Sequence, residues 1–192
     1  MSKQKKVDSP AVLLVEGKND EHIMYALFEK YAIPDTFMVV NCEGIDKLKS
    51  TKNNLVEGIG VRLKGSNLQR LGIIVDADTD IQNRWQSLKD IFSESGYILP
   101  NIIPQKGLII EQNNKRIGVW IMPDNNANGM IEDFIRFLIP VNDSLISIAT
   151  HILEDIESKS LNHYNQNLHK SKALIHTWLA WQKDPGTPLG SL

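Results

Sequence analysis

The stretch that most constrains the fold is residues 71–80, where an apolar run ends abruptly in three alternate aspartates. The aliphatic and β-branched side chains of Ile73, Ile74 and Val75 are typical of a strand that is buried on both faces, as strands are in parallel sheets. In α/β proteins, the residues just beyond the carboxyl end of such a strand line the ligand crevice. The sequence therefore predicts an α/β fold with a functional site at the end of this strand.

The composition allows a full hydrophobic core. Hydrophobic residues make up 42% of the 192 residues, so the chain can bury a core without disulfides or structural metals. We expect residues 11–139 to form an α/β domain and residues 140–192 to form a helical extension packed on it. The single cysteine, Cys42, excludes both an intrachain disulfide and a cysteine-rich zinc site.

The distribution of charge and apolar residues indicates a cytoplasmic protein. No apolar run reaches the roughly 20 residues that span a bilayer. Residues 1–10 carry charge but lack the apolar core of a signal peptide. The formal net charge is −2, so a surface that binds nucleic acid would have to be a local patch.

The first half of the chain repeats a strand-then-helix pattern. Residues 11–15 read as a second buried strand that ends in Glu16 and Gly17, and a helix follows from Asn19 or Asp20. Residues 36–42 form a third candidate strand, followed by a helix with apolar members at positions 45, 48, 55 and 56. The basic connection of residues 59–70 is expected to be a solvated loop. After the aspartates, an apolar stripe at helical spacing from Ile81 to Phe92 predicts a helix that faces the core.

The second half predicts a hairpin and then helices. Residues 108–110 and 117–122 flank the polar link 111–116, and we expect the second arm to close the sheet. One helix should start near Met130 and end before Pro140, and another should start at Asn142 or Asp143. The last helix should bury its apolar residues, which are Leu168, Leu174, Trp178 and Trp181. The histidines of this half should be surface or packing residues; they are His151, His163, His169 and His176.

Several established chemistries lack their motifs in this chain. There is no Walker-type phosphate loop, no glycine-rich dinucleotide fingerprint after the first strand, no nucleophile elbow and no histidine pair at metalloprotease spacing. What remains is one glutamate and a group of aspartates at the ends of predicted parallel strands. Because right-handed crossovers place these strand ends on one edge of the sheet, the carboxylates should converge.

The spacing of these acids predicts roles for them and leaves alternatives open. Side chains alternate along an extended segment, so Asp76 and Asp78 could point the same way and share one hard cation such as Mg²⁺. The alternative is that Asp76 is a turn residue and that Thr79 or Asp80 caps the next helix. Other acids could be outer ligands or a second metal site, with capping or turn formation as the alternative for each. These are Asp20, Asp124, Glu132 and Asp133.

Two of these motifs resemble the TOPRIM domain shared by topoisomerases, bacterial-type primases and OLD-family nucleases. Residues 15–20 (Val-Glu-Gly-Lys-Asn-Asp) are similar to its hydrophobic-Glu-Gly motif, and residues 74–78 (Ile-Val-Asp-Ala-Asp) to its Asp-x-Asp motif. Residues 41–44 (Asn-Cys-Glu-Gly) are similar to its intermediate glycine turn. The resemblance covers about residues 11–124. Residues 118–124, followed by residues 129–132, look more like a small family of uncharacterised prokaryotic TOPRIM-like proteins.

The resemblance implies a mainly parallel, Rossmann-like sheet flanked by helices and a role for each motif acid. Glu16 would be the general acid or base, and Asp76 and Asp78 would hold magnesium. Asp80 matches an acid that some members carry two residues further on. No tyrosine-bearing cleavage domain and no primase zinc module accompany these motifs, so topoisomerase or full primase activity is not expected.

The chemistry of phosphate esters supports the same expectation independently. Phosphodiester cleavage or transfer must offset charge on the phosphoryl oxygens, and a divalent ion held by carboxylates does so. We expect a Mg²⁺- or Mn²⁺-dependent phosphodiesterase-type enzyme, a nuclease or phosphotransferase, that acts on nucleic acid. The alternative is a noncatalytic nucleic-acid-binding or regulatory module of a larger defence or repair assembly, with a protein partner or a second copy of itself. Hydrolysis of a small phosphate compound is a third reading.

Overall fold

The computed structural model describes residues 9–49, 58–186 and 189. Its strands are β1 (Ala11–Val15), β2 (Met38–Asn41), β3 (Arg70–Asp76), β4 (Leu108–Gln112) and β5 (Lys115–Met122). Its helices are α1 (Lys18–Lys30), α2 (Ile45–Leu48), α3 (Ile59–Lys64), α4 (Ile81–Glu94), α5 (Ile131–Leu138), α6 (Ser144–Ser158) and α7 (Gln166–Ala180).

The strands form one sheet in the order β2-β1-β3-β5-β4, with the aspartate-bearing strand β3 at its centre. The pairings of β1 with β2, of β1 with β3 and of β3 with β5 are parallel, and only β4 runs antiparallel among the described strands. The predicted α/β class and mainly parallel sheet are therefore confirmed. Since four strands point the same way, their carboxyl ends lie on one edge of the sheet.

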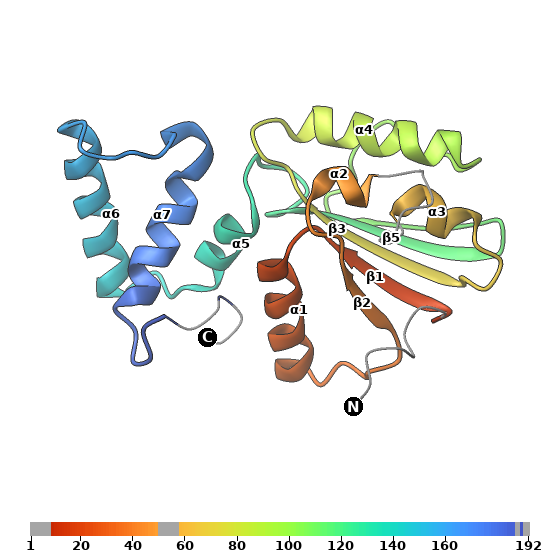
Figure 1. Ribbon diagram of the computed structural model, residues 1–192, viewed down its shortest axis with the longest axis horizontal. Coiled ribbons are helices and arrows are strands. Elements are labelled where there is room, and N and C mark those ends of the chain that lie inside the picture. Colours follow the sequence, from red (N-terminus) through yellow and green to blue (C-terminus); the bar gives the residue numbers. More distant parts are fainter. Residues whose placement is uncertain (1–8, 50–57, 187–188, 190–192) are drawn as a thin grey trace.

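Helices cover both faces of the sheet (Figure 1). One core lies under α2, α3 and α4 and includes Leu14, Ile73 and Leu88. The other lies under α1 and α5 and includes Val15 and Met122. Alternate residues of β3 thus enter opposite cores, as the uninterrupted apolar run predicted.

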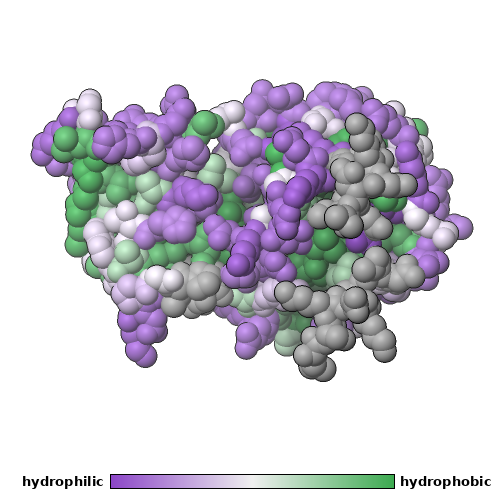
Figure 2. All heavy atoms as spheres, viewed as in Figure 1, coloured by the Kyte–Doolittle hydropathy of each residue, from purple (hydrophilic) through white to green (hydrophobic). Residues whose placement is uncertain are grey.

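The C-terminal helices continue the second core. Ile146 of α6 and Ile175 of α7 belong to the same buried cluster as Val15 of β1. The prediction that Leu168 of α7 and Trp181, the residue after α7, are inward was wrong, because they are 41% and 38% exposed. Helix α7 instead buries Ile175, Trp178 and Leu179, which share one face at i, i+3 and i+4 spacing. Apolar residues also gather along the surface of α6 (Figure 2), where Ile148 and Ile152 are exposed.

Two further details of the sequence-based fold need correction. Residues 59–70 are not simply a solvated loop, because they contain α3, whose apolar pair Ile59 and Leu63 is buried while Lys64 is exposed. Leu55 and Val56, predicted to be helical, lie outside the described residues.

The hairpin is confirmed, but the prediction that its second arm closes the sheet was wrong. The first arm, β4, forms the edge of the sheet, and β5 pairs with both β3 and β4. The turn residues Asn113 and Asn114 have φ values of +52° and +58°, as a tight hairpin turn requires. Within the described part of the chain, no helix is long and apolar enough to cross a membrane.

Candidate functional site

A pocket of about 410 Å³ opens at the carboxyl edge of the parallel strands. Five carboxylates from three segments of the chain line it: Glu16, Asp20, Asp76, Asp78 and Glu132. Basic groups also contribute to its wall: Lys18, His169 and Lys172. The strand ends of β1 and β3 therefore bring their acids together, as the parallel topology predicted.

Glu16 directly follows β1 and is joined to both neighbouring strands. Its Oε2 accepts a hydrogen bond from the Asp76 backbone N–H at 3.4 Å, and its carbonyl oxygen accepts one from the Gly44 N–H at 2.8 Å. Gly44 has φ +116°, a conformation that glycine adopts readily, so the turn after β2 can reach β1. Burial raises the pKa of Glu16, while the Arg84 guanidinium works in the opposite direction.

Asp20 caps helix α1 with one oxygen and leaves the other without a partner. Its Oδ2 accepts from the Gly17 N–H at 3.1 Å, and a Cβ at position 17 would lie only 3.2 Å from this oxygen. Asp20 is 5% exposed, and its Oδ1 is buried with no hydrogen-bond partner in the described structure. Burial raises the pKa of Asp20 to about 6. The capping role is therefore real, and it leaves a buried oxygen beside the pocket.

Asp76 is the last residue of β3 and the most perturbed acid of the site. The residue as a whole is half-buried, but its Oδ1 is fully buried and has no hydrogen-bond partner among the described residues. Burial, followed by the negative charges of Asp20, Glu16 and Glu132, raises the pKa of Asp76 to about 9. Without a cation, this carboxyl is protonated at neutral pH.

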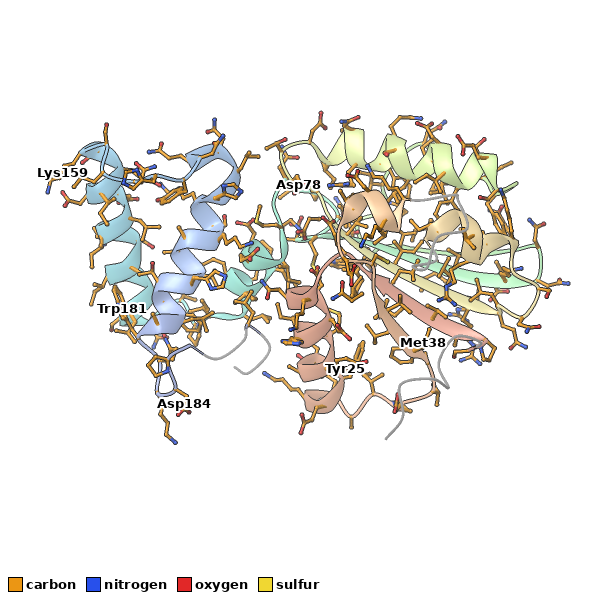
Figure 3. The ribbon with its side chains drawn as sticks, in the orientation of Figure 1. Tyr25, Met38, Asp78, Lys159, Trp181 and Asp184 are labelled. Carbon is orange, nitrogen blue, oxygen red and sulfur yellow. The ribbon has the colours of Figure 1, made fainter. Side chains whose placement is uncertain are left out.

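Asp78 is held by its backbone and by an ion pair. Its N–H and carbonyl oxygen bond to the carbonyl and N–H of Gly129, both at 2.8 Å, and its φ is +54°. The side chain pairs with the buried guanidinium of Arg84. The backbone is therefore no longer extended at Asp78, so side-chain alternation does not place Asp78 on the same side as Asp76. Both residues nevertheless line the same pocket. Figure 3 shows Asp78 between the sheet edge and the segment that leads to α5.

Glu132 enters the pocket from α5 and is only 2% exposed. Its neighbour Asp133 holds the start of this helix, because its Oδ2 accepts from the Met130 N–H at 2.9 Å. The other oxygen of Asp133 accepts from the Ser171 hydroxyl of α7. The placement of Glu132 thus depends on how α7 docks against α5.

Two predicted site residues, Asp80 and Asp124, make local hydrogen bonds. Asp80 caps α4, since its Oδ1 accepts from the Asn83 N–H at 3.0 Å. Asp124 stabilises its own turn by accepting from the N–H groups of Asn126 and Ala127 at 3.0 and 2.7 Å. Neither acid is among the described residues that line the pocket. The capping and turn-forming alternatives account for both contacts.

Sequence reasoning missed the basic residues near these acids. Arg84 lies within the buried face of α4, beside Trp85, and a charged residue in an apolar stripe was the available signal. Lys49 follows α2 and interacts electrostatically with Glu16 and Asp78. His169 is exposed, as predicted, yet it borders the pocket together with Lys172 one turn further along α7. No sequence signal places α7 there, because its position depends on tertiary packing.

The side chains of the pocket offer the donor atoms that a hard cation prefers. All five acids offer oxygen, the donor that Mg²⁺ and Mn²⁺ prefer, and two buried oxygens lack partners. Across residues 9–49, 58–186 and 189, no group of three or more His, Cys, Asp or Glu side chains is arranged to hold a metal ion. Magnesium is commonly bound through one or two carboxylates, with water and substrate oxygens as its other ligands. Asp76 and Asp78 thus stay the predicted magnesium ligands.

Comparison with known proteins identifies the family but no activity. A family model described as "Protein of unknown function (DUF3226)" matches residues 10–192, so the chain belongs to this family. Neither the curated proteins nor the solved structures contain a match. The TOPRIM resemblance and the roles of the site residues stay predictions.

Proposed function

We propose that this chain is a Mg²⁺- or Mn²⁺-dependent phosphodiesterase-type enzyme, a nuclease, that acts on nucleic acid. The observation that carries the proposal is the pair of buried, unpartnered oxygens of Asp20 and Asp76 in a pocket shared with Glu16 and Glu132. Burying carboxylates side by side is unfavourable unless they are protonated or a cation lies among them. A divalent cation relieves this repulsion and suits an acidic pocket at the carboxyl edge of a parallel sheet.

Each acid then has a distinct task. Asp76 and Asp78 would hold the cation, which would neutralise charge on the phosphoryl oxygens and orient the attacking water. Glu16 would move a proton, because burial raises its pKa toward the range useful for general acid and base chemistry. The hydrogen bond from the Asp76 N–H fixes one Glu16 oxygen while leaving the carboxyl group within the pocket.

Basic side chains suit a polyanionic substrate. Lys18 and Lys172 are exposed at the pocket, and His169 stands beside Lys172 on α7. Although the net charge of the chain is −2, these groups form a local patch next to the acids, where phosphates flanking the scissile bond could bind. A cytoplasmic location fits the proposal, since Cys42 is a buried free thiol.

A cleavage assay with matched variants tests this function. Supercoiled plasmid and labelled single-stranded DNA and RNA are incubated with Mg²⁺, Mn²⁺ or EDTA. Wild type and Asp90→Asn, a control on the exposed face of α4, should cleave only with metal. Asp76→Asn should not cleave. Metal-independent cleavage, or equal cleavage by Asp76→Asn, would contradict the proposal.

A noncatalytic nucleic-acid-binding or regulatory module is the second candidate. The ion pair of Asp78 with Arg84, and the finding that no group of three metal-ligating side chains is assembled in the described residues, favour it. Such a module, acting with a protein partner or a second copy of itself, would bind single-stranded DNA equally well with Mg²⁺ and with EDTA. It would also leave every nucleic acid substrate intact.

A further inference from the structure

We propose that Arg84 binds phosphate after a divalent cation has displaced it from Asp78. The cation takes the Asp78 carboxylate, and the released guanidinium binds a phosphate beside the cation. The inference rests on the proposed function and goes beyond it, because it assigns a substrate-binding role to a residue outside the carboxylate set. It also makes the Asp78–Arg84 ion pair a device that couples metal binding to phosphate binding.

The guanidinium of Arg84 is buried and incompletely satisfied. Its side chain is only 7% exposed, one nitrogen pairs with Asp78, and its Nε has no hydrogen-bond partner in the part of the chain that the structure describes. A buried arginine normally has its donors satisfied, since an unpaired charged donor is costly. Arg84 therefore has capacity for a second acceptor. Its planar fork matches the oxygens of a phosphate.

Asp78 can change partners without a change in the backbone. The paired hydrogen bonds with Gly129 hold its N–H and carbonyl oxygen in place. Its side chain is 45% exposed and lines the pocket, so rotation of the carboxylate is enough to turn it from Arg84 to a cation. Since Asp78 pairs with Arg84 and also lines the pocket, this rotation would free the guanidinium nitrogen that Asp78 now holds.

The charges around the pocket are arranged for this exchange. Arg84 interacts with Glu16 and Lys49, so positive charge gathers on the Asp78 side. The carboxylates of Asp20 and Glu132 interact with Asp76. A cation at Asp76 and Asp78 would therefore have carboxylates near one ligand and the Arg84 guanidinium near the other. A phosphate could then contact the cation and the released guanidinium together, with charge-assisted hydrogen bonds to the latter.

Metal titration gives the first test. Calorimetry measures Mn²⁺ binding to wild type, Arg84→Gln and Lys49→Gln. Lys49 also interacts with Glu16 and Asp78, but it forms no ion pair with Asp78 within the described residues, so Lys49→Gln controls for the loss of one positive charge. Arg84→Gln should bind Mn²⁺ about tenfold more tightly, the scale of one charged hydrogen bond, and more tightly than Lys49→Gln. Unchanged or weaker binding by Arg84→Gln, or an equal gain in both variants, would overturn the inference.

Binding of inorganic phosphate at saturating Mn²⁺ gives the second test. Arg84→Gln should bind phosphate about tenfold more weakly than wild type, whereas Arg84→Lys, which keeps the charge without the fork, should fall between them. Equal phosphate affinity in wild type and Arg84→Gln would refute the role. If Arg84→Gln does not fold by circular dichroism, Arg84→Lys carries both tests, with tighter Mn²⁺ and weaker phosphate binding than wild type expected.

The outcomes separate this inference from the proposed function. If wild type binds no Mn²⁺ and cleaves nothing, the proposed function fails and the inference fails with it. If wild type binds Mn²⁺ and cleaves nucleic acid but the Arg84 variants bind metal and phosphate as wild type does, only the inference fails.

Discussion

Replacing Asp76 by asparagine should stabilise the metal-free protein, although the substitution alters a buried polar residue. Asn keeps the shape of Asp76, removes its charge, and its amide can donate to neighbouring carboxylates such as Glu16 or Asp20. The pKa of Asp76 is about 9 in the folded chain, against an ordinary value of 3.8. At pH 7 Asp76 is thus protonated in the folded state and ionised in the unfolded chain. Its ionisation on unfolding favours the unfolded state by at most about 4 kcal/mol.

The measurable gain should be smaller than this limit, because Asp76 keeps partial contact with solvent. We expect about half of it, roughly 2 kcal/mol, which raises Tm by roughly 4–8 °C in a chain of this size. The assay is thermal unfolding in EDTA from pH 5 to pH 9. The raised pKa of an acid means that wild-type stability falls as pH rises from about 4 to about 9. Asp76→Asn should flatten this slope, and Mn²⁺ should raise Tm in wild type only.

The control is Asp90→Asn, which removes an exposed carboxylate of α4. It should change neither the Tm in EDTA at pH 7 nor the pH slope by a measurable amount. The reasoning would be refuted if Asp76→Asn were no more stable than wild type in EDTA, or if its Tm fell with rising pH as steeply as that of wild type. Either result would mean that Asp76 is ionised at neutral pH in the folded, metal-free protein.

The remaining predictions concern turnover, substrate binding and the loop around Asp78. Glu16→Gln should keep the fold and most Mn²⁺ affinity but cut cleavage by roughly 10²-fold or more, the usual effect of losing a positioned proton-transfer group; full activity would remove Glu16 from the mechanism. Lys172→Gln should weaken single-stranded DNA binding in fluorescence anisotropy and make the salt dependence of binding shallower. Lys159→Gln, far from the pocket at the end of α6, should do neither, and equal effects of the two substitutions would exclude a local patch. Gly129→Ala should lower stability toward urea by about 2 kcal/mol and weaken Mn²⁺ binding, because Gly129 has φ +140° and its Cβ would lie 2.6 Å from the Asp133 carboxylate; wild-type stability would contradict this.

Much of the fold was predictable because its signals are local. Buried strands such as β1 and β3 are short apolar runs, and the helix after β3 shows an apolar stripe at helical spacing. The parallel topology then predicted that the acids after β1 and β3 would meet at one edge, and Glu16, Asp76 and Asp78 do line one pocket. Helix α3 was missed because its six residues include a glycine and two basic side chains, and only tertiary packing shows that Ile59 and Leu63 are buried.

The individual partners of the site acids were not predictable from sequence spacing. Asp78 and Asp80 follow Asp76 at equal intervals, but their roles differ. Asp78 has a left-handed backbone conformation, whereas Asp80 caps α4. The partner of Asp78, Arg84, follows six residues later in the next helix, and its burial reflects the packing of α4 on the sheet. His169 and Lys172 reach the pocket only because α7 docks on α5. These contacts depend on long-range packing that no short motif encodes.

Anomalous diffraction from a crystal soaked in Mn²⁺ is the most direct test of the central claim that this pocket holds a divalent cation. The account predicts one anomalous peak between the Asp76 and Asp78 carboxylates, with Glu16 nearby and the Asp78 side chain turned from Arg84 toward the ion. The same soak of an Asp76→Asn crystal should show no peak there. A wild-type crystal that binds no Mn²⁺ in this pocket, or binds it equally after the substitution, would contradict the account.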